Sequence, residues 1–433
     1  MSDDSHGGDS TTATAATAAT ATWTREAAAR VERYDDAVSP VIYPPETDQF
    51  EGLHVWDTWP LRNRDGTLAE VDGRRVVCSL TTTDDLLPGK RHDVARIHYF
   101  HSNDGETWTH GGPLFDDDAL GSRQWAGSAL YDDGEVYAFY TASGERGEEE
   151  LSYTQRIAAG TGASLVADGD ELVVDGEWTH EILLEPDGER YERPDQSRGM
   201  TYTFRDPWFF EDPADGETYL LFEANTPVDT DDEAANFNGS VGIAHSPSGD
   251  PMEWELEPPL LDAVGVNQEL ERPHLVVREE RYYLFVSSHQ HTFAPGIEGH
   301  DALYGFVADE LRGSYRPLND GGVVATNPEN APFQAYSWTV YDHGDELLAV
   351  SFFNYYDYVG ATLDGIAELP PEEQQRRFGG TLAPTLRIRV DGDRTRLAGT
   401  LTHGAVPLPT EELSPVVRRG VGGGDGESTG SYR

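Results

Sequence analysis

The sequence contains almost no cysteine, almost no lysine and no long hydrophobic run. Its one cysteine, Cys78, cannot form a disulfide within the chain, and its place in the apolar run 75–80 predicts a small buried side chain rather than a nucleophile. The absence of any run of about 18 apolar residues excludes a membrane-spanning helix. The first 22 residues lack the basic and Leu-rich regions of a secretory signal, so we expect no recognisable signal peptide.

Charge of one sign dominates the composition. The chain carries 79 acidic residues against 31 basic ones, a formal charge of −48, and Lys90 is its single lysine. This balance excludes a nucleic-acid binder, which needs a basic surface, and argues against binding to an anionic membrane. Carboxylate-rich, lysine-poor surfaces are typical of extreme halophiles, where molar salt screens self-repulsion. With 37% hydrophobic and 10% aromatic residues the chain is globular rather than disordered.

We expect one folded domain, residues 41–415, between two tails. Residues 1–40 combine an acidic, Ala/Thr-rich tail with a short helix, and residues 416–433 form a Gly-rich tail. A helix opened by Thr24 is expected over 24–36, and another follows Leu369-Pro370-Pro371 and ends at Gly379-Gly380.

Between the tails, the pattern is that of many short antiparallel strands. Strand-like runs occur at 75–80, 96–100, 135–141, 218–223, 273–277, 281–288, 302–307, 335–341, 346–353, 385–390 and 395–402. Asp-Gly pairs, a strong hairpin signal, occur at 72–73, 104–105, 133–134, 175–176, 215–216 and 391–392. The fold class is therefore all-β, and the pattern alone leaves open a large sandwich or a propeller.

The first unusual acidic segment places Asp57 between two tryptophans, in His54-Val55-Trp56-Asp57-Thr58-Trp59-Pro60. If the aromatic rings line a pocket, Asp57 is partly desolvated beside ring faces that suit sugar stacking. The alternative is that Asp57 only closes a turn before Pro60.

The second segment is Phe204-Arg205-Asp206-Pro207-Trp208. Pro207 predicts an extended backbone at Asp206, with Arg205 and Asp206 on opposite sides of a strand. A structural ion pair is the simpler explanation of this pair taken alone.

The third segment is Asn267-Gln268-Glu269-Leu270-Glu271-Arg272-Pro273-His274. On a strand, Glu269 and Glu271 share one face, and neighbouring like charges raise the pKa of one of them. A solvated acidic face is the alternative. Three carboxylate sites in aromatic surroundings suggest glycosyl transfer, which needs a nucleophile and a proton donor on either side of the bond.

Together these segments resemble the motifs of glycoside hydrolase family 68, the levansucrases and inulosucrases. The resemblance extends from about Trp56 to Phe353 and implies a five-bladed β-propeller with an acidic pocket. It makes Asp57 the nucleophile, Asp206 the stabiliser of the transition state and Glu271 the acid/base, with no cofactor. Invertase-family enzymes share the Arg-Asp-Pro motif, but they carry different nucleophile and acid segments that are absent here.

The resemblance also implies which residues bind substrate. Trp125, in Arg123-Gln124-Trp125-Ala126-Gly127-Ser128, is expected to wall the fructose pocket, and Tyr336, in Pro332-Phe333-Gln334-Ala335-Tyr336-Ser337, to approach Glu271. The substrate-binding residues implied are Trp56, Trp125, Ser128, Arg205, Glu269, Arg272, His289 and Tyr336.

Three positions depart from the family pattern. Ala126 replaces a serine that bonds the nucleophile, and His289 stands where Gram-positive members carry arginine. Gln268 replaces an aspartate of the calcium site of those members, so no metal is expected there.

The implied function is cleavage of sucrose with transfer of fructose to a fructan of levan or inulin type, or to water. The expected partners are sucrose and fructan acceptors. The protein is expected to be extracellular and monomeric. A plain sucrose hydrolase on the same scaffold and a non-catalytic carbohydrate-binding propeller are the alternatives.

The charge balance generates a first prediction. Dilution from molar to low salt should unfold the chain, because unscreened carboxylates repel one another. Circular dichroism across a salt series measures this, and a fold that is fully stable at low salt contradicts the halophilic interpretation.

Overall fold

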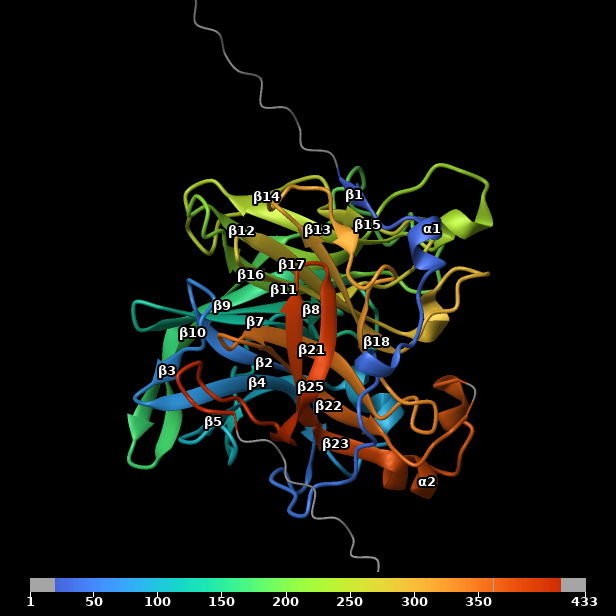
Figure 1. Cartoon of the computed structure of the whole chain (residues 1–433). Helices are drawn as coiled ribbons and strands as arrows, with labels where there is room; N and C mark the ends of the chain where they lie inside the picture. Colours follow the sequence, from blue (N-terminus) through green and yellow to red (C-terminus); the bar gives the residue numbers. More distant parts are fainter. Residues whose placement is uncertain (1–19, 361, 414–433) are drawn as a thin grey trace, which may run out of the picture.

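The computed structural model describes residues 20–360 and 362–413, and it is mostly β, as the sequence predicts (Figure 1). The expected C-terminal tail and most of the Ala/Thr-rich segment lie outside the described residues. Cys78 is buried, as predicted, and burial raises the pKa of its thiol to about 12.

The largest sheet has nine strands and consists of two antiparallel runs joined by parallel pairing of β2 with β7. The first run contains β2 (Leu53–Asn63), β3 (Glu70–Val71), β4 (Arg74–Thr83), β5 (Arg96–Ser102) and β6 (Thr109–Pro113). The second run contains β7 (Arg123–Asp132), β8 (Glu135–Ser143), β9 (Gln155–Asp168) and β10 (Glu171–Leu184).

Three smaller sheets contain the other strands. A six-stranded sheet comprises β1 (Ala21–Thr22), β11 (Phe204–Glu211), β12 (Thr218–Asn225), β13 (Gly239–Ser246), β14 (Glu255–Leu256) and β15 (Leu261–Asp262). A five-stranded sheet comprises β16 (Glu271–Arg278), β17 (Arg281–Ser288), β18 (Ala302–Ala308), β19 (Arg316–Pro317) and β20 (Val323–Thr326). The last comprises β21 (Ala335–Asp342), β22 (Leu347–Tyr355), β23 (Phe378–Leu382), β24 (Pro384–Asp391) and β25 (Arg394–His403).

Two Asp-Gly pairs form two-residue hairpin turns, as expected. Asp72-Gly73 and Asp133-Gly134 have positive φ at both residues, the conformation that matches the twist of paired strands. The hairpin turn predicted at 175–176 is wrong, because this pair lies inside β10 at a change of register. The hairpin between β9 and β10 instead turns at residues 169–170.

The first helix is shorter than predicted, and the second lies within two residues of its predicted span. α1 spans only Arg25–Ala28, capped by the Thr24 hydroxyl, and the chain then runs on to Tyr34, whose hydroxyl donates to the carbonyl of Asn319. α2 spans Pro371–Arg377, and the two glycines expected to end it belong to β23. Five 3₁₀ turns complete the described elements: η1 (Asp35–Ala37), η2 (Pro88–Asp93), η3 (Glu233–Asn236), η4 (Gln290–Thr292) and η5 (Asp364–Ile366).

The strands β2, β7, β11, β16 and β21 neighbour one another in a closed circuit, in that order, with β21 beside β2. The sheets extend outward from these strands through antiparallel neighbours. The circuit therefore brings segments that are far apart in sequence next to one another.

Each strand of this circuit is interrupted by a bulge at one of the sequence motifs. The interruptions fall at Asp57, at Ala126, after Arg205, after Glu271 and after Tyr336. A bulge locally breaks the ladder and re-aims side chains, which is how a continuous strand can present polar groups to a cavity.

Four bulge residues have a left-handed backbone, namely Asp57 (φ 47°), Asp206 (φ 60°), Arg272 (φ 52°) and Ser337 (φ 59°). This conformation costs a non-glycine residue about 1–2 kcal/mol. The value at Asp206 corrects the expectation of an extended backbone. The bulge overrides the extended conformation that Pro207 favours. In the bulge, the Asp206 amide donates a hydrogen bond to Thr141 Oγ1 (2.9 Å).

Part of the expected N-terminal tail is packed on the sheets. β1 pairs in parallel with β15, and the next residue, Trp23, is fully buried. Its ring contacts those of Phe293, Tyr304 and Phe306 at centroid distances of 5.2–5.7 Å.

Replacing Trp23 with alanine should therefore destabilise the whole domain by about 3–5 kcal/mol, the cost of a large buried cavity. Chemical denaturation in molar salt measures the loss. The matched control is Tyr43→Ala, because that ring is 74% exposed. Equal stability of the two variants contradicts the packing described here.

Candidate active site

A cavity of about 540 Å³ opens where the bulges of the circuit strands meet. It is lined by carboxylates, guanidinium groups and rings from all five circuit strands: Asp57, Trp125, Ala126, Arg205, Asp206, Glu269, Glu271, Arg272, Tyr336 and Ser337. Arg91 and His92 of η2, His289 after β17 and Tyr355 at the end of β22 also line it. The three acidic motifs of the sequence thus converge on one cavity.

Asp57 stands apart from the other acids of the site. Within the described ranges 20–360 and 362–413, its carboxylate has no hydrogen-bond or ion-pair partner. Burial lowers the pKa values of Arg91 and Arg272, and the charge of Asp57, acting at longer range, partly opposes this effect. An unbonded carboxylate that faces a cavity is free to act as a nucleophile.

Arg205 holds three glutamates together. Its Nε donates to Glu223 Oε2 (2.7 Å), and its second terminal nitrogen donates to Glu269 Oε1 (3.1 Å) and Glu271 Oε1 (3.0 Å). Only 8% of Arg205 is exposed, and Glu223 is fully buried. Charge-assisted bonds of this kind are shorter and stronger than neutral ones, so they position the glutamates firmly.

The pair Glu269 and Glu271 departs from the prediction in one respect. β16 begins at Glu271, so Glu269 precedes the strand instead of sharing its face. The two carboxylates nevertheless lie close together, because both accept a hydrogen bond from the same nitrogen of Arg205.

Glu271 is held in a form that can donate a proton. Burial and the neighbouring charge of Glu269 raise the pKa of Glu271 to about 7, against the opposing effects of Arg205, His289 and Tyr336. The hydroxyl of Tyr336 donates to Glu271 Oε2. A carboxyl with this pKa exchanges its proton readily near neutral pH, as a general acid/base must.

A charged imidazole lies behind Tyr336. His289 stacks on the Tyr336 ring at a centroid distance of 3.6 Å and an interplanar angle of 10°. Burial acts against its positive charge, but Asp301 Oδ2, 2.8 Å from His289 Nδ1, and the nearby glutamates raise the pKa of His289 to about 9. The imidazole is therefore cationic at neutral pH and contributes one positive charge to the acidic site.

Asp206 is bound by the backbone of the neighbouring circuit strand. Its Oδ2 accepts from the amide of Arg272 (3.1 Å), where the β16 bulge leaves that amide unpaired. Burial raises the pKa of Asp206 to about 6, which Arg205 and Arg272 oppose and the charge of Asp57 reinforces.

Arg272 ties the strands of the circuit to one another. Its guanidinium donates to Ser337 Oγ (3.0 Å), Thr339 Oγ1 (3.0 Å) and the carbonyl of Thr58 (3.2 Å). It also lies over the ring of Trp59, 5.4 Å from the centroid. These contacts connect the bulged segments of β2, β16 and β21.

Two residues expected in the site do not line the cavity. Trp56 is fully buried behind the ring of His92, and Ser128 is buried with its hydroxyl accepting from the amide of Phe209 (3.0 Å). The bulge at Asp57 turns Asp57 to the cavity and Trp56 away from it. Trp125 does line the cavity, and its indole donates to the carbonyl of His92 (2.9 Å).

Several residues in or next to the site were not predicted from the sequence. Glu223 interrupts the apolar run 219–224 of β12, a buried-charge signal that could have been noticed. Arg91, His92 and Asp301 lie in loops of ordinary polar composition, where no pattern distinguishes them.

The described part of the chain contains no group of three or more His, Cys, Asp or Glu residues that could hold a metal ion. Gln268 stands where the resemblance places a calcium-binding aspartate in other members. Its side chain donates to the carbonyl of Thr201 (2.9 Å) and to Asn238 Oδ1 (3.2 Å). Of the described helices, none has the length and apolarity needed to cross a membrane.

Comparison with known proteins connects this geometry to one family. Residues 12–231 and 226–407 match the family model described as levansucrase/invertase. An extracellular sucrase of Zymomonas mobilis is 34% identical over 89% of this chain and 94% of its own length. A levansucrase of Pseudomonas savastanoi pv. glycinea is 34% identical over 89% and 96%.

A solved structure gives a higher identity. An inulosucrase from Halalkalicoccus jeotgali bound to kestose shares 63% identity and superposes with a TM-score of 0.90 over 92% of this chain and 99% of that one. A levansucrase from Gluconacetobacter diazotrophicus, 25% identical, superposes with a TM-score of 0.79 over 90% and 94%.

The electrostatics of the cavity generate a prediction about Glu271. Replacing Glu269 with glutamine removes the like charge while keeping an oxygen for Arg205, so the pKa of Glu271 should fall below about 7. Infrared titration of the carboxyl, assigned by subtracting the Glu271→Gln spectrum, measures the change. The exposed Glu46→Gln is the control, and an unchanged pKa in Glu269→Gln contradicts the assignment.

Proposed function

The chain belongs to glycoside hydrolase family 68, the levansucrase/invertase family, and from this premise we propose that it cleaves sucrose and transfers the fructosyl unit. The acceptor is a growing fructan of levan or inulin type, or water. The observation that carries the proposal is the pairing of a free carboxylate, Asp57, with a partly protonated one, Glu271, in a single cavity.

The reaction proceeds by double displacement with retention of configuration. Asp57 attacks the fructosyl C2 of sucrose while Glu271 donates its proton to the glycosidic oxygen, and glucose leaves. Glu271, now ionised, removes a proton from the incoming acceptor, whose oxygen attacks C2 and releases Asp57. The carboxylates return to their starting states and no cofactor is required.

The neighbouring charges support each step. Asp206, held by the Arg272 amide, hydrogen-bonds fructose hydroxyls and stabilises the positive charge that develops on the ring. Arg205 and Tyr336 orient Glu271, and Glu269 contacts the sugar. Trp125 walls the fructosyl pocket, and His289 shapes the acceptor side.

We also propose that the five antiparallel runs are the blades of a five-bladed β-propeller within a catalytic domain at residues 41–415. The closed circuit of β2, β7, β11, β16 and β21 supports this assignment, because the innermost strands of a propeller surround its axis. The protein acts outside the cell as a monomer, and the name of the Zymomonas mobilis sucrase supports the location.

Plain hydrolysis of sucrose is the second candidate, since water can take the place of the acceptor at the same site. The same Zymomonas mobilis relative, named a sucrase, favours it. Only the fate of the fructosyl unit separates the two functions, because both release glucose by the same first step.

The test is the separate assay of glucose and fructose released from sucrose in molar salt. Transfer predicts glucose in clear excess over free fructose, because fructosyl units enter the product. Equal amounts mean a hydrolase, and release of neither sugar contradicts both and leaves a carbohydrate-binding protein.

Two variants connect the activity to the site. Asp57→Asn and Glu271→Gln should each lower turnover by at least about a thousandfold without unfolding, because each removes the group that attacks or protonates. The control is Asp36→Asn, an exposed acid outside the cavity. Retained turnover in either of the first two variants contradicts the mechanism.

A further inference from the structure

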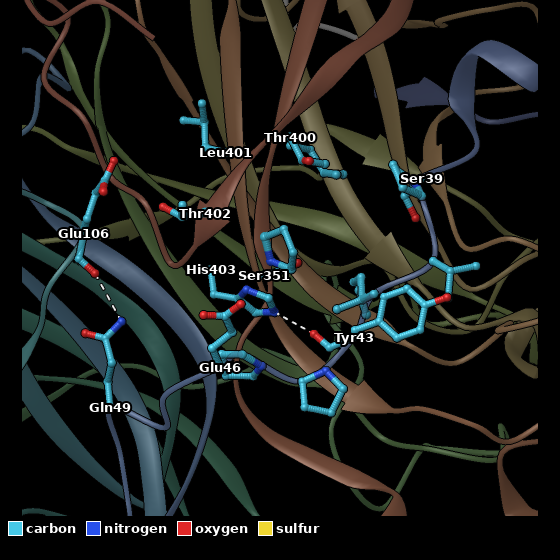
Figure 2. Close-up of a pocket in the computed structure, with 18 of the residues that line it drawn as sticks. Ser39, Tyr43, Glu46, Gln49, Glu106, Ser351, Thr400, Leu401, Thr402 and His403 are labelled. Carbon is cyan, nitrogen blue, oxygen red and sulfur yellow. Dashed lines mark hydrogen bonds between the residues drawn. The ribbon is translucent and has the colours of Figure 1, made fainter. Parts of the chain in front are cut away.

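A second cavity, of about 550 Å³, lies outside the proposed active site (Figure 2). Residues 39–46 form one side of it, and β24 and the edge strand β25 form another, with Pro384, Leu386 and Thr400 to His403 in its lining. It is as large as the cavity proposed to take sucrose. A ligand of the same size therefore fits.

The two cavities share one wall, made of β21 and β22. On β21, Ala335 and Trp338 line the second cavity, while Tyr336 and Ser337 between them line the first. On β22, Ser351 faces the second cavity and Phe352 the first. A ligand in the second cavity is thus separated from Glu271 and its partner Tyr336 by the thickness of one sheet.

The lining of the second cavity is almost uncharged. In a chain with 79 acidic residues it includes only Glu46 and Glu106, both exposed, and neither lysine nor arginine. Such a surface offers nothing to a phosphate or another anion, which needs cationic or helix-terminal donors. The lining therefore disfavours an anionic ligand and suits an uncharged one.

The polar groups of the lining are those that bind hydroxyls. Figure 2 shows Ser351, Thr400, Thr402 and His403 around the hollow. Ser351 and Trp338 are at least 98% buried, and Ser351 Oγ and Trp338 Nε1 have no hydrogen-bond partner among the described residues. Both groups therefore keep a hydrogen-bonding position that a hydroxyl of a ligand in the cavity would satisfy.

An aromatic ring stands at the same cavity, on a preformed segment. Tyr43 lines the cavity and is 74% exposed, and Pro44 and Pro45 follow it. His403 Nε2 donates to the Tyr43 carbonyl (3.0 Å), and Gln334 Oε1 accepts from the amide of Ile42 (2.8 Å). Because the segment is already fixed, binding requires little further ordering.

We propose that this cavity binds a neutral oligosaccharide, and that its occupant is the fructoside chain that the enzyme elongates. Hydroxyl-binding groups beside an exposed ring fit a sugar, whose polar rim and apolar face need both. The inference rests on the proposed function. Holding a product on the same molecule raises its local concentration at the active site, which favours further elongation.

Binding is tested in Glu271→Gln, which cannot turn the ligand over, with kestose titrated calorimetrically in molar salt. We expect two sites per chain. Adding Tyr43→Ala should weaken one of them about tenfold, through loss of a stacking contact, and leave the other unchanged. The matched control adds Val173→Ala, an exposed apolar residue that lines neither cavity.

The outcomes separate this inference from the function on which it rests. A single site that Tyr43→Ala leaves unchanged overturns the second site while the active site stands. Two sites that are both insensitive to Tyr43→Ala overturn its placement at this cavity. No binding of kestose to either variant contradicts the proposed function as well.

Product length gives an independent measurement in the active enzyme. Tyr43→Ala should shorten the fructan products while the initial rate of glucose release from sucrose stays the same, because the ring lies outside the active-site cavity. Unchanged product lengths overturn the elongation role.

Discussion

The site depends on one guanidinium, that of Arg205, which bonds Glu223, Glu269 and Glu271 at once. Three carboxylates this close and this buried repel one another and lose hydration, so without a central cation they would protonate or move apart. Arg205 keeps them in place but does not neutralise them all. Burial is the largest cause that raises the pKa of Glu223 well above its usual range. Burial and the charge of Glu269 raise the pKa of Glu271 to about 7. Glu271 thus retains the proton that the reaction needs because it is buried beside other carboxylates.

A second constraint is the backbone geometry that brings these groups together. A regular strand turns successive side chains to opposite faces, and β11 and β21 are buried on both faces over nearly their whole length. The bulges with left-handed backbone at Asp57, Asp206, Arg272 and Ser337 interrupt the strand ladders where these residues line the cavity. The amides that they leave unpaired are used, as when Arg272 donates to Asp206. Backbone strain is thus placed where chemistry is proposed and is compensated by the packing of the sheets.

The fold class and the convergence of the acidic motifs could be predicted from the sequence, because strand patterns, Asp-Gly turns and family motifs are local. The direction in which a bulged strand turns its side chains is not local, since one extra residue inverts the alternation. Trp56 and Ser128 were therefore assigned to a cavity from which the structure turns them away. Glu223 and Asp301 act through partners distant in sequence, Arg205 and His289.

Asp57, the one acid of the site without a partner among the described residues, is the residue proposed to carry the fructosyl unit. Rapid acid quench of the enzyme during turnover of sucrose, followed by peptide mass spectrometry, tests it most directly. The account predicts one hexosyl group on the peptide that contains Asp57. A hexosyl group on another carboxylate, or none under conditions of steady turnover, would contradict it.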